Sequence, residues 1–180
     1  MKKAQLGQVF IFILAAALAI LIIVYGYKAI SSFTSRTEDI ALVNLKTTLQ
    51  SEVRTIASDY GSVKKVDISL PGKYDMLCLI DLQYPDNLKQ NKCLCRADCA
   101  GVYANDYNPT VCDAWETPGY EYNAFLVSGN SFESIELTDI NIIEPATNQN
   151  LGYICIAPSG NRISLRLEGA GDSTNVYEWQ

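Results

Sequence analysis

The sequence predicts an α+β protein in which a long N-terminal helix, transmembrane and then amphipathic, precedes a small antiparallel β-sheet or sandwich head with a disulfide-stapled loop. Three observations support this prediction. Residues 6–27 are uncharged and mostly apolar, residues 28–60 repeat apolar side chains at helical spacing, and residues 61–180 change to short alternating segments that hold all six cysteines. The 180-residue chain has room for one ordinary domain beside its N-terminal segment.

The apolar run indicates a membrane helix that is kept in the mature protein. Residues 6–27 give 22 uncharged positions, close to the roughly 20 residues that a helix needs to cross a bilayer. A cleaved secretory signal has a shorter apolar region, about 7 to 15 residues, that ends at a small-x-small site. The small-x-small candidates at 15–17 and 17–19 are followed by more apolar sequence, which argues against cleavage there. We therefore expect residues 1–27 to form a basic N-terminus and a transmembrane helix.

The flanking charges and the cysteines indicate which side of the membrane the head occupies. Lys2 and Lys3 precede the run, and basic flanks tend to stay in the cytoplasm. Lys28 and Arg36 follow the run and weaken this bias. Six cysteines beyond a membrane segment indicate an oxidising compartment, because cytosolic thiols are kept reduced. We expect a membrane-anchored protein with its N-terminus inside and an extracytoplasmic head.

Residues 28–60 are expected to continue the helix as an amphipathic segment. They contain no proline or glycine, and apolar side chains recur at spacings of three and four at Leu42, Leu45, Leu49, Val53, Ile56 and Tyr60. Gly61 stands where a C-terminal cap is expected. A stalk or a membrane-proximal coiled coil explains the same stripe.

Residues 61–180 are expected to form a β-rich extracytoplasmic head. Candidate strands, separated by turn signals, lie at 66–70, 76–82, 122–127, 134–143, 152–157, 162–168 and 175–179. Residues 84–119 show no sustained period and carry four of the six cysteines. We predict that they form a stapled loop.

Cys78 and Cys155 lie in apolar strand candidates and are candidates for a cross-sheet disulfide that closes a long loop. Two unpaired buried thiols are the alternative, since free cysteine packs as a small hydrophobe.

Four further cysteines are clustered within the loop at Cys93, Cys95, Cys99 and Cys112, and they allow three pairings. Closure of Cys93 on Cys95 is geometrically poor, so each is expected to take a separate partner from Cys99 and Cys112. The same four thiols are the candidate ligands of an alternative zinc site. Their C-x-C-x3-C spacing differs from the usual pair of C-x2-C knuckles, and no metal or other cofactor is our expectation.

Composition argues against nucleic-acid binding and catalysis. The net charge is −6, and residues 61–180 hold eight basic against sixteen acidic side chains, which repel phosphate backbones. The chain has no histidine and none of the common catalytic or phosphate-binding motifs. We expect no enzyme.

The loop is also rich in aromatic residues, which indicate an adhesive patch, a subunit contact or packing over the disulfides. These residues are Tyr103, Tyr107, Trp115, Tyr120 and Tyr122.

The segment Lys3-Ala4-Gln5-Leu6 resembles the class III signal that archaeal prepilin peptidases cut, with a basic residue, a small residue and then the start of the apolar run. Gly7-Gln8 is a second candidate site. The layout of a long N-terminal helix before a compact β head is similar to that of type IV pilins and archaellins. Bacterial pilins carry a glutamate at the fifth mature position, where this chain has Val9. Archaeal relatives commonly lack this glutamate, so the departure points to an archaeal pilin-like protein.

This resemblance implies a structural subunit of a surface filament. It implies cleavage by a prepilin peptidase after Ala4 and a homo-oligomer built through the N-terminal helix. The core of the filament would then contain Val9, Phe10, Ile13, Leu14, Leu18 and Leu21. The alternative is a monomeric single-pass surface protein that binds a partner through its loop.

Overall fold

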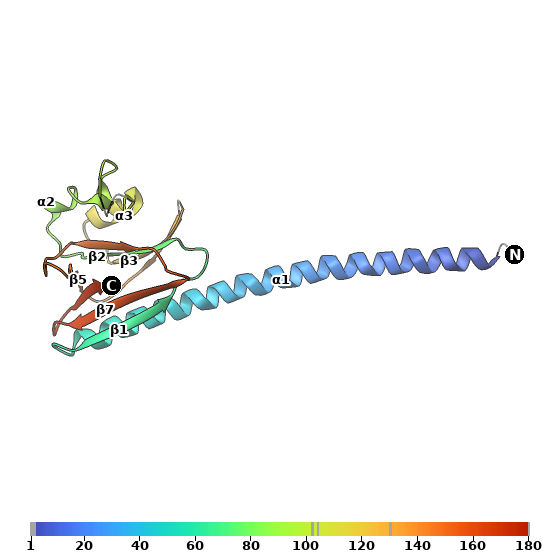
Figure 1. Ribbon diagram of the computed structural model, residues 1–180, viewed down its shortest axis with the longest axis horizontal. Helices are drawn as coiled ribbons and strands as arrows, with labels where there is room; N and C mark the ends of the chain where they lie inside the picture. The colour runs from blue at the N-terminus through green and yellow to red at the C-terminus, as the bar shows by residue number, and fades with distance from the viewer. Residues whose placement is uncertain (1–2, 102, 104, 130, 180) are drawn as a thin grey trace. The chain divides into compact units, whose positions relative to one another are not determined.

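The computed structural model describes residues 3–101, 103, 105–129 and 131–179, and for residues 3–9 and 31–36 it describes the backbone alone. The fold is α+β, with one long helix and two four-stranded sheets (Figure 1). The chain divides into two compact units, Met1–Ile40 and Ala41–Gln180. The first unit is helical in its described part, and the second, which we call the head, contains the remainder of the helix and every strand.

Helix α1 runs from Lys3 to Ala57, 55 residues without a break, as the uninterrupted apolar and amphipathic patterns predict. Its last turns bury Leu45, Leu49, Val53 and Ile56 in the core of the head. The predicted stripe extends one member too far, because the helix ends at Ala57 and Tyr60 is 82% exposed.

The first sheet has the strand order β1-β7-β8-β5 and the second has β4-β3-β2-β6. In the first sheet the strands span Val63–Ser69 (β1), Arg162–Gly169 (β7), Thr174–Glu178 (β8) and Ile140–Ile142 (β5). In the second they span Ser131–Ile135 (β4), Ala124–Ser128 (β3), Met76–Ile80 (β2) and Tyr153–Ile156 (β6). Neighbours are antiparallel except β5 and β8, which are parallel, so the predicted antiparallel sheet is correct only in part.

The predicted strand at 134–143 is wrong as a single element, because its ends belong to different sheets. β4 ends at Ile135 and β5 begins at Ile140. The buried side chain of Asn123 holds the crossing between them, since its Oδ1 accepts from Leu137 N at 2.8 Å and its Nδ2 donates to Thr138 O at 3.3 Å. These bonds satisfy backbone groups that would otherwise pair along a continuous strand.

The second sheet is buried on both faces. Leu77 and Leu79 of β2 pack into the main core with α1 and the first sheet, whereas Cys78 and Ile80 pack into a second core on the opposite face. This two-sided burial explains why β2 is an unbroken apolar run in the sequence, while the one-sided β7 alternates.

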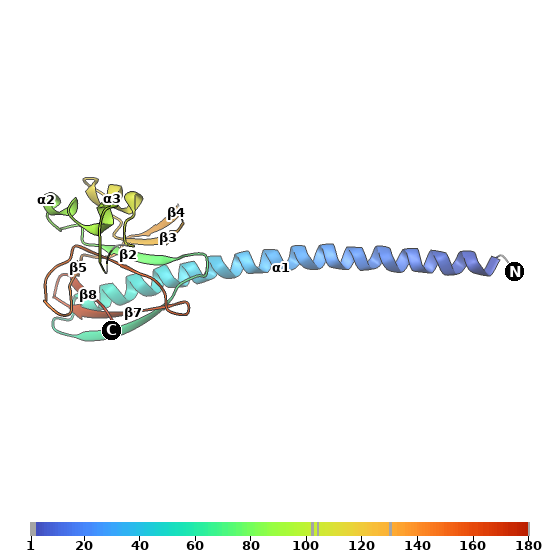
Figure 2. The ribbon, with the colours of Figure 1, turned by 45° about the horizontal axis from the view of Figure 1, so that its top comes forward.

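Residues 84–119, which we call the lobe, cover that opposite face (Figures 1 and 2). The prediction of a loop is corrected here, because the described residues of the lobe form three short helices: α2 (Asp86–Lys89), η1 (Cys93–Cys95) and α3 (Pro109–Glu116). Asn108 caps α3, accepting from Val111 N at 3.1 Å, and proline occupies its first turn. Helices of three to eight residues are too short to give a period that can be recognised in the sequence.

The end of α1 is joined closely to the first sheet within the head. Gly61 N donates to Gly169 O at 2.8 Å, and the buried Thr174 hydroxyl donates to Val53 O at 2.9 Å. A Cβ atom at Gly169 would collide with the backbone carbonyl oxygens of Ile56 and Asp59. Glycine at this position therefore allows the closest approach of sheet and helix.

Candidate functional site

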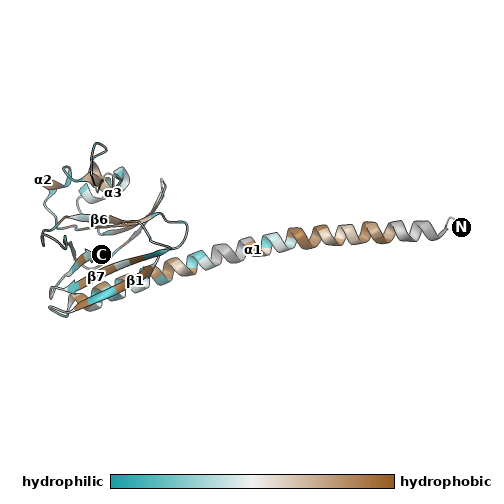
Figure 3. Ribbon diagram, in the orientation of Figure 1, coloured by the Kyte–Doolittle hydropathy of each residue, from teal (hydrophilic) through white to brown (hydrophobic). Residues whose placement is uncertain are grey.

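The most prominent candidate for a functional surface is the apolar part of α1. Phe10–Ile30, 21 residues with a mean hydropathy of 2.7, is long and apolar enough to cross a membrane (Figure 3). At about 1.5 Å per residue it extends about 32 Å, the thickness of a bilayer core. None of this span is buried in the described part of the chain.

The predicted core residues of the span lie on several sides of the helix. Between 50% and 66% of the side chain is exposed at Phe10, Ile13, Leu14, Leu18 and Leu21. The consecutive residues 10–13 are all exposed and apolar, and a helix that is apolar all round belongs in lipid or among other apolar helices. The side chains of Val9 and of the predicted cleavage residues Lys3, Ala4 and Gln5 lie outside the described residues.

The first disulfide joins two neighbouring strands under the lobe. Cys78 of β2 and Cys155 of β6 stand directly opposite each other in the antiparallel register, with their Cα atoms 4.0 Å apart. The bridge therefore lies within one sheet instead of crossing between two sheets. It is on the face that the lobe covers.

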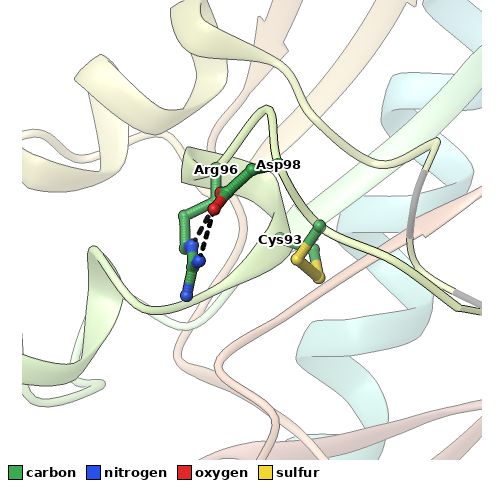
Figure 4. Close-up of a disulfide and its surroundings, with 4 residues drawn as sticks. Cys93, Arg96 and Asp98 are labelled. Carbon is green, nitrogen blue, oxygen red and sulfur yellow. Dashed lines mark hydrogen bonds and ion pairs between the residues drawn. A yellow bond between two sulfur atoms is a disulfide. The ribbon is translucent and has the colours of Figure 1, made fainter.

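Two further disulfides staple the lobe, Cys93 to Cys99 and Cys95 to Cys112. This arrangement is one of the pairings that the sequence leaves open. Within the smaller loop, Arg96 donates two hydrogen bonds to Asp98, at 2.9 and 2.7 Å (Figure 4). These bonds and the charge of Arg96 lower the pKa of Asp98. The ion pair is exposed, so its contribution to stability is small.

The disulfides leave the predicted zinc alternative without thiolates. Cys95, Cys112 and Glu116 offer ligand atoms within 4.8 Å of one another. Both sulfur atoms belong to the same disulfide, so they are not the thiolate ligands that zinc requires. The four lobe cysteines therefore act as covalent staples in this structure.

Trp115 fixes the lobe to the end of β2, and Lys89 joins two helices within the lobe. Trp115 is 1% exposed, and its indole N–H donates to Asp81 O at 2.8 Å. The ammonium of the buried Lys89 donates to Trp115 O at 2.8 Å and pairs with the exposed Asp86 at 2.7 Å. Because every bond of Lys89 is made at the base of the lobe, we interpret this residue as structural.

A buried carboxyl group of the lobe lies against β6. Asp106 accepts a hydrogen bond from the Tyr153 hydroxyl, but its Oδ2 has no partner among the described residues. Burial raises the pKa of Asp106 to about 6, and the negative charge of Glu178 adds to this effect. Burial and the nearby Asp106 also raise the pKa of Tyr153.

The aromatic residues of the lobe divide between packing and exposure. Trp115 is core, and Tyr120 stacks on Phe125 with ring centroids 6.1 Å apart. Tyr103 and Tyr107 remain exposed on the lobe, and Tyr122 is exposed just beyond its end. The aromatic patch is therefore smaller than the sequence suggests.

Sequence reasoning missed a cluster on the first sheet, formed by Arg166, Tyr177 and Trp179, where a hollow lies on the polar face. The signal is the placement of two aromatics at alternate positions, Tyr177 of β8 and Trp179 directly after it, on a face that otherwise carries polar groups.

Comparisons with known proteins add no relative: no family model matches the chain, and no curated protein or solved structure matches it at a significant level.

Proposed function

We propose that this protein is the structural subunit of an archaeal type IV pilus-like surface filament. A prepilin peptidase cuts after Ala4, the apolar helix is retained, and copies of the chain assemble through it. The observation that carries the proposal is the span Phe10–Ile30, of which none is buried against the residues that the structure describes. A surface this apolar requires lipid or protein around it.

In this proposal the span lies first in the membrane and later among identical helices of the filament. Before assembly the 21-residue span matches the thickness of a bilayer. After extraction from the membrane the same side chains need an equally apolar surrounding, which identical helices supply. The mechanism is burial of one apolar rod against others, and it requires no catalysed reaction.

The head suits the outside of such a filament. Three disulfides lock it covalently, which is typical of proteins in oxidising compartments. Residues 61–180 carry sixteen acidic against eight basic side chains, and a net charge of this size keeps exposed surfaces soluble.

The substitution Ile13→Lys tests the proposal. A lysine within the apolar core of a filament would be buried without a partner, so we expect filaments to disappear while the head stays folded. The matched control Thr48→Lys adds the same charge to an exposed position of α1 in the head and is expected to assemble normally. Membrane fractionation separates a failure of insertion from a failure of assembly. Abundant, normal filaments of Ile13→Lys would refute the proposal.

A monomeric membrane-anchored binding domain is the second candidate, because a single apolar span also serves as an anchor. A photo-activatable residue at Leu14 or Leu18 distinguishes the two, since both side chains are half exposed. Dense ladders of the chain cross-linked to itself favour the filament, and cross-links to lipid alone favour the anchor.

A further inference from the structure

The outer face of the first sheet carries a small hollow whose lining mixes aromatic and charged groups. Its volume is about 240 Å³, and it is lined by Pro145, Arg166, Tyr177, Glu178 and Trp179. The neighbouring positions of β7, Leu165 and Leu167, are in the main core. Because side chains alternate along a strand, Arg166 projects from the opposite, outer face.

Arg166 is held in place but makes few of its hydrogen bonds. Its Cζ lies 4.8 Å from the centroid of the Tyr177 ring, and one terminal nitrogen lies 3.3 Å from Glu168 Oε2. The same carboxylate oxygen accepts from the Tyr177 hydroxyl at 3.2 Å. Arg166 Nε is buried without a partner among the described residues. Because the buried Nε cannot reach an external ligand, the terminal nitrogens of this 41% exposed side chain are the donors that an external acceptor can meet.

Trp179 supplies an aromatic plane at the rim of the hollow. The side chain is 46% exposed, although tryptophan on a polar sheet face is usually covered. Lys65 of β1 approaches the ring to 5.1 Å from its centroid, which restrains the indole from one side. An indole held in this way offers a rigid apolar contact for a ring with C–H bonds on its face.

We propose that this hollow binds a single ring of a neutral saccharide. A sugar hydroxyl accepts as well as donates, so one ring can accept from Arg166 while its C–H face packs on Trp179. A carboxylate or phosphate would only accept, and it would meet the negative charge of Glu168 beside Arg166 and of an acidic head. The volume is below the range of about 300 to 1,000 Å³ that holds drug-sized ligands, so further sugar units extend into solvent.

The test uses the full chain in phosphatidylcholine nanodiscs, because detergents with sugar headgroups would occupy the hollow. The probes are the methyl glycosides of glucose, galactose and mannose, with methyl glucuronide as the charged counterpart. Saturation-transfer NMR and titration calorimetry measure binding. We expect saturable binding of at least one neutral glycoside, weakened at least about tenfold by Trp179→Ala and by Arg166→Gln.

Arg162→Gln is the matched control, since Arg162 is exposed on the same strand and does not line the hollow. It is expected to bind as the unchanged protein does, and fluorescence of the buried Trp115 checks that each variant is folded. Binding by no neutral glycoside, preference for the glucuronide, or equal binding by all variants would overturn the proposal. The inference does not rest on the filament: Ile13→Lys is expected to keep its binding even where it abolishes assembly.

Discussion

Removing the disulfide between Cys78 and Cys155 with the double substitution to alanine is expected to cost more stability than removing either staple of the lobe. The two residues are 77 positions apart, whereas the staples join residues 6 and 17 positions apart. If the stabilisation is the entropy of the unfolded chain, these separations give about 4.5, about 2 and about 3 kcal/mol. The fully buried Cys78 adds a small cavity to the largest loss.

The assay is guanidinium unfolding of the full chain, followed by the fluorescence of Trp115, which packs 6.0 Å from Tyr153 at the base of the lobe. Small domains are stable by about 5 to 15 kcal/mol, so the double variant should unfold at a much lower denaturant concentration. The matched control is the pair of alanines at Cys93 and Cys99. Equal losses of unfolding free energy in the two double variants, or a larger loss in the control, would refute the entropic explanation.

Two further outcomes concern single residues of the head. Gly169→Ala should lower the free energy of unfolding of the head by about 1 to 3 kcal/mol, because its Cβ would collide with carbonyl oxygens at and just after the end of α1. Gly72→Ala is the control, since its Cβ would meet nothing within 4 Å, and it should be nearly neutral when both variants are compared by thermal unfolding. The pKa of Asp106 is raised from 3.8 to about 6 on folding, so the folded state binds the extra proton and stability should fall as the pH rises from about 4 to 6. Asp106→Asn should reduce the dependence of the unfolding free energy on pH, but only in part, because burial also raises the pKa of Asp81. An unchanged dependence on pH would contradict the raised pKa of Asp106.

The features that could be predicted from the sequence are those in which apolar side chains recur at a regular spacing over several residues. The stripe from Leu45 to Ile56 faces the core as its spacing indicates, and the alternation of β7 matches a sheet with one buried face. Gly61 follows the helix closely, although the chain leaves the helix at Ala57 and forms a turn first.

The features that could not be predicted depend on partners distant in the sequence. Strand alternation carries no direction, so nothing local distinguishes the parallel pairing of β5 with β8. Asn123 separates β4 from β5 through bonds to residues 14 and 15 positions away. The hollow at Arg166 forms only when β7, β8 and the turn at Pro145 meet, so the alternate aromatics Tyr177 and Trp179 do not by themselves locate it in the sequence.

Mass analysis of the intact protein and its N-terminus, in material taken both from the native membrane and from the cell surface, tests the central proposal most directly. We expect a chain that begins at Gln5 and keeps the whole span Phe10–Ile30 in surface material. A chain that begins at Met1 or Lys2 and stays in the membrane would contradict filament assembly, as would surface material from which the span has been removed.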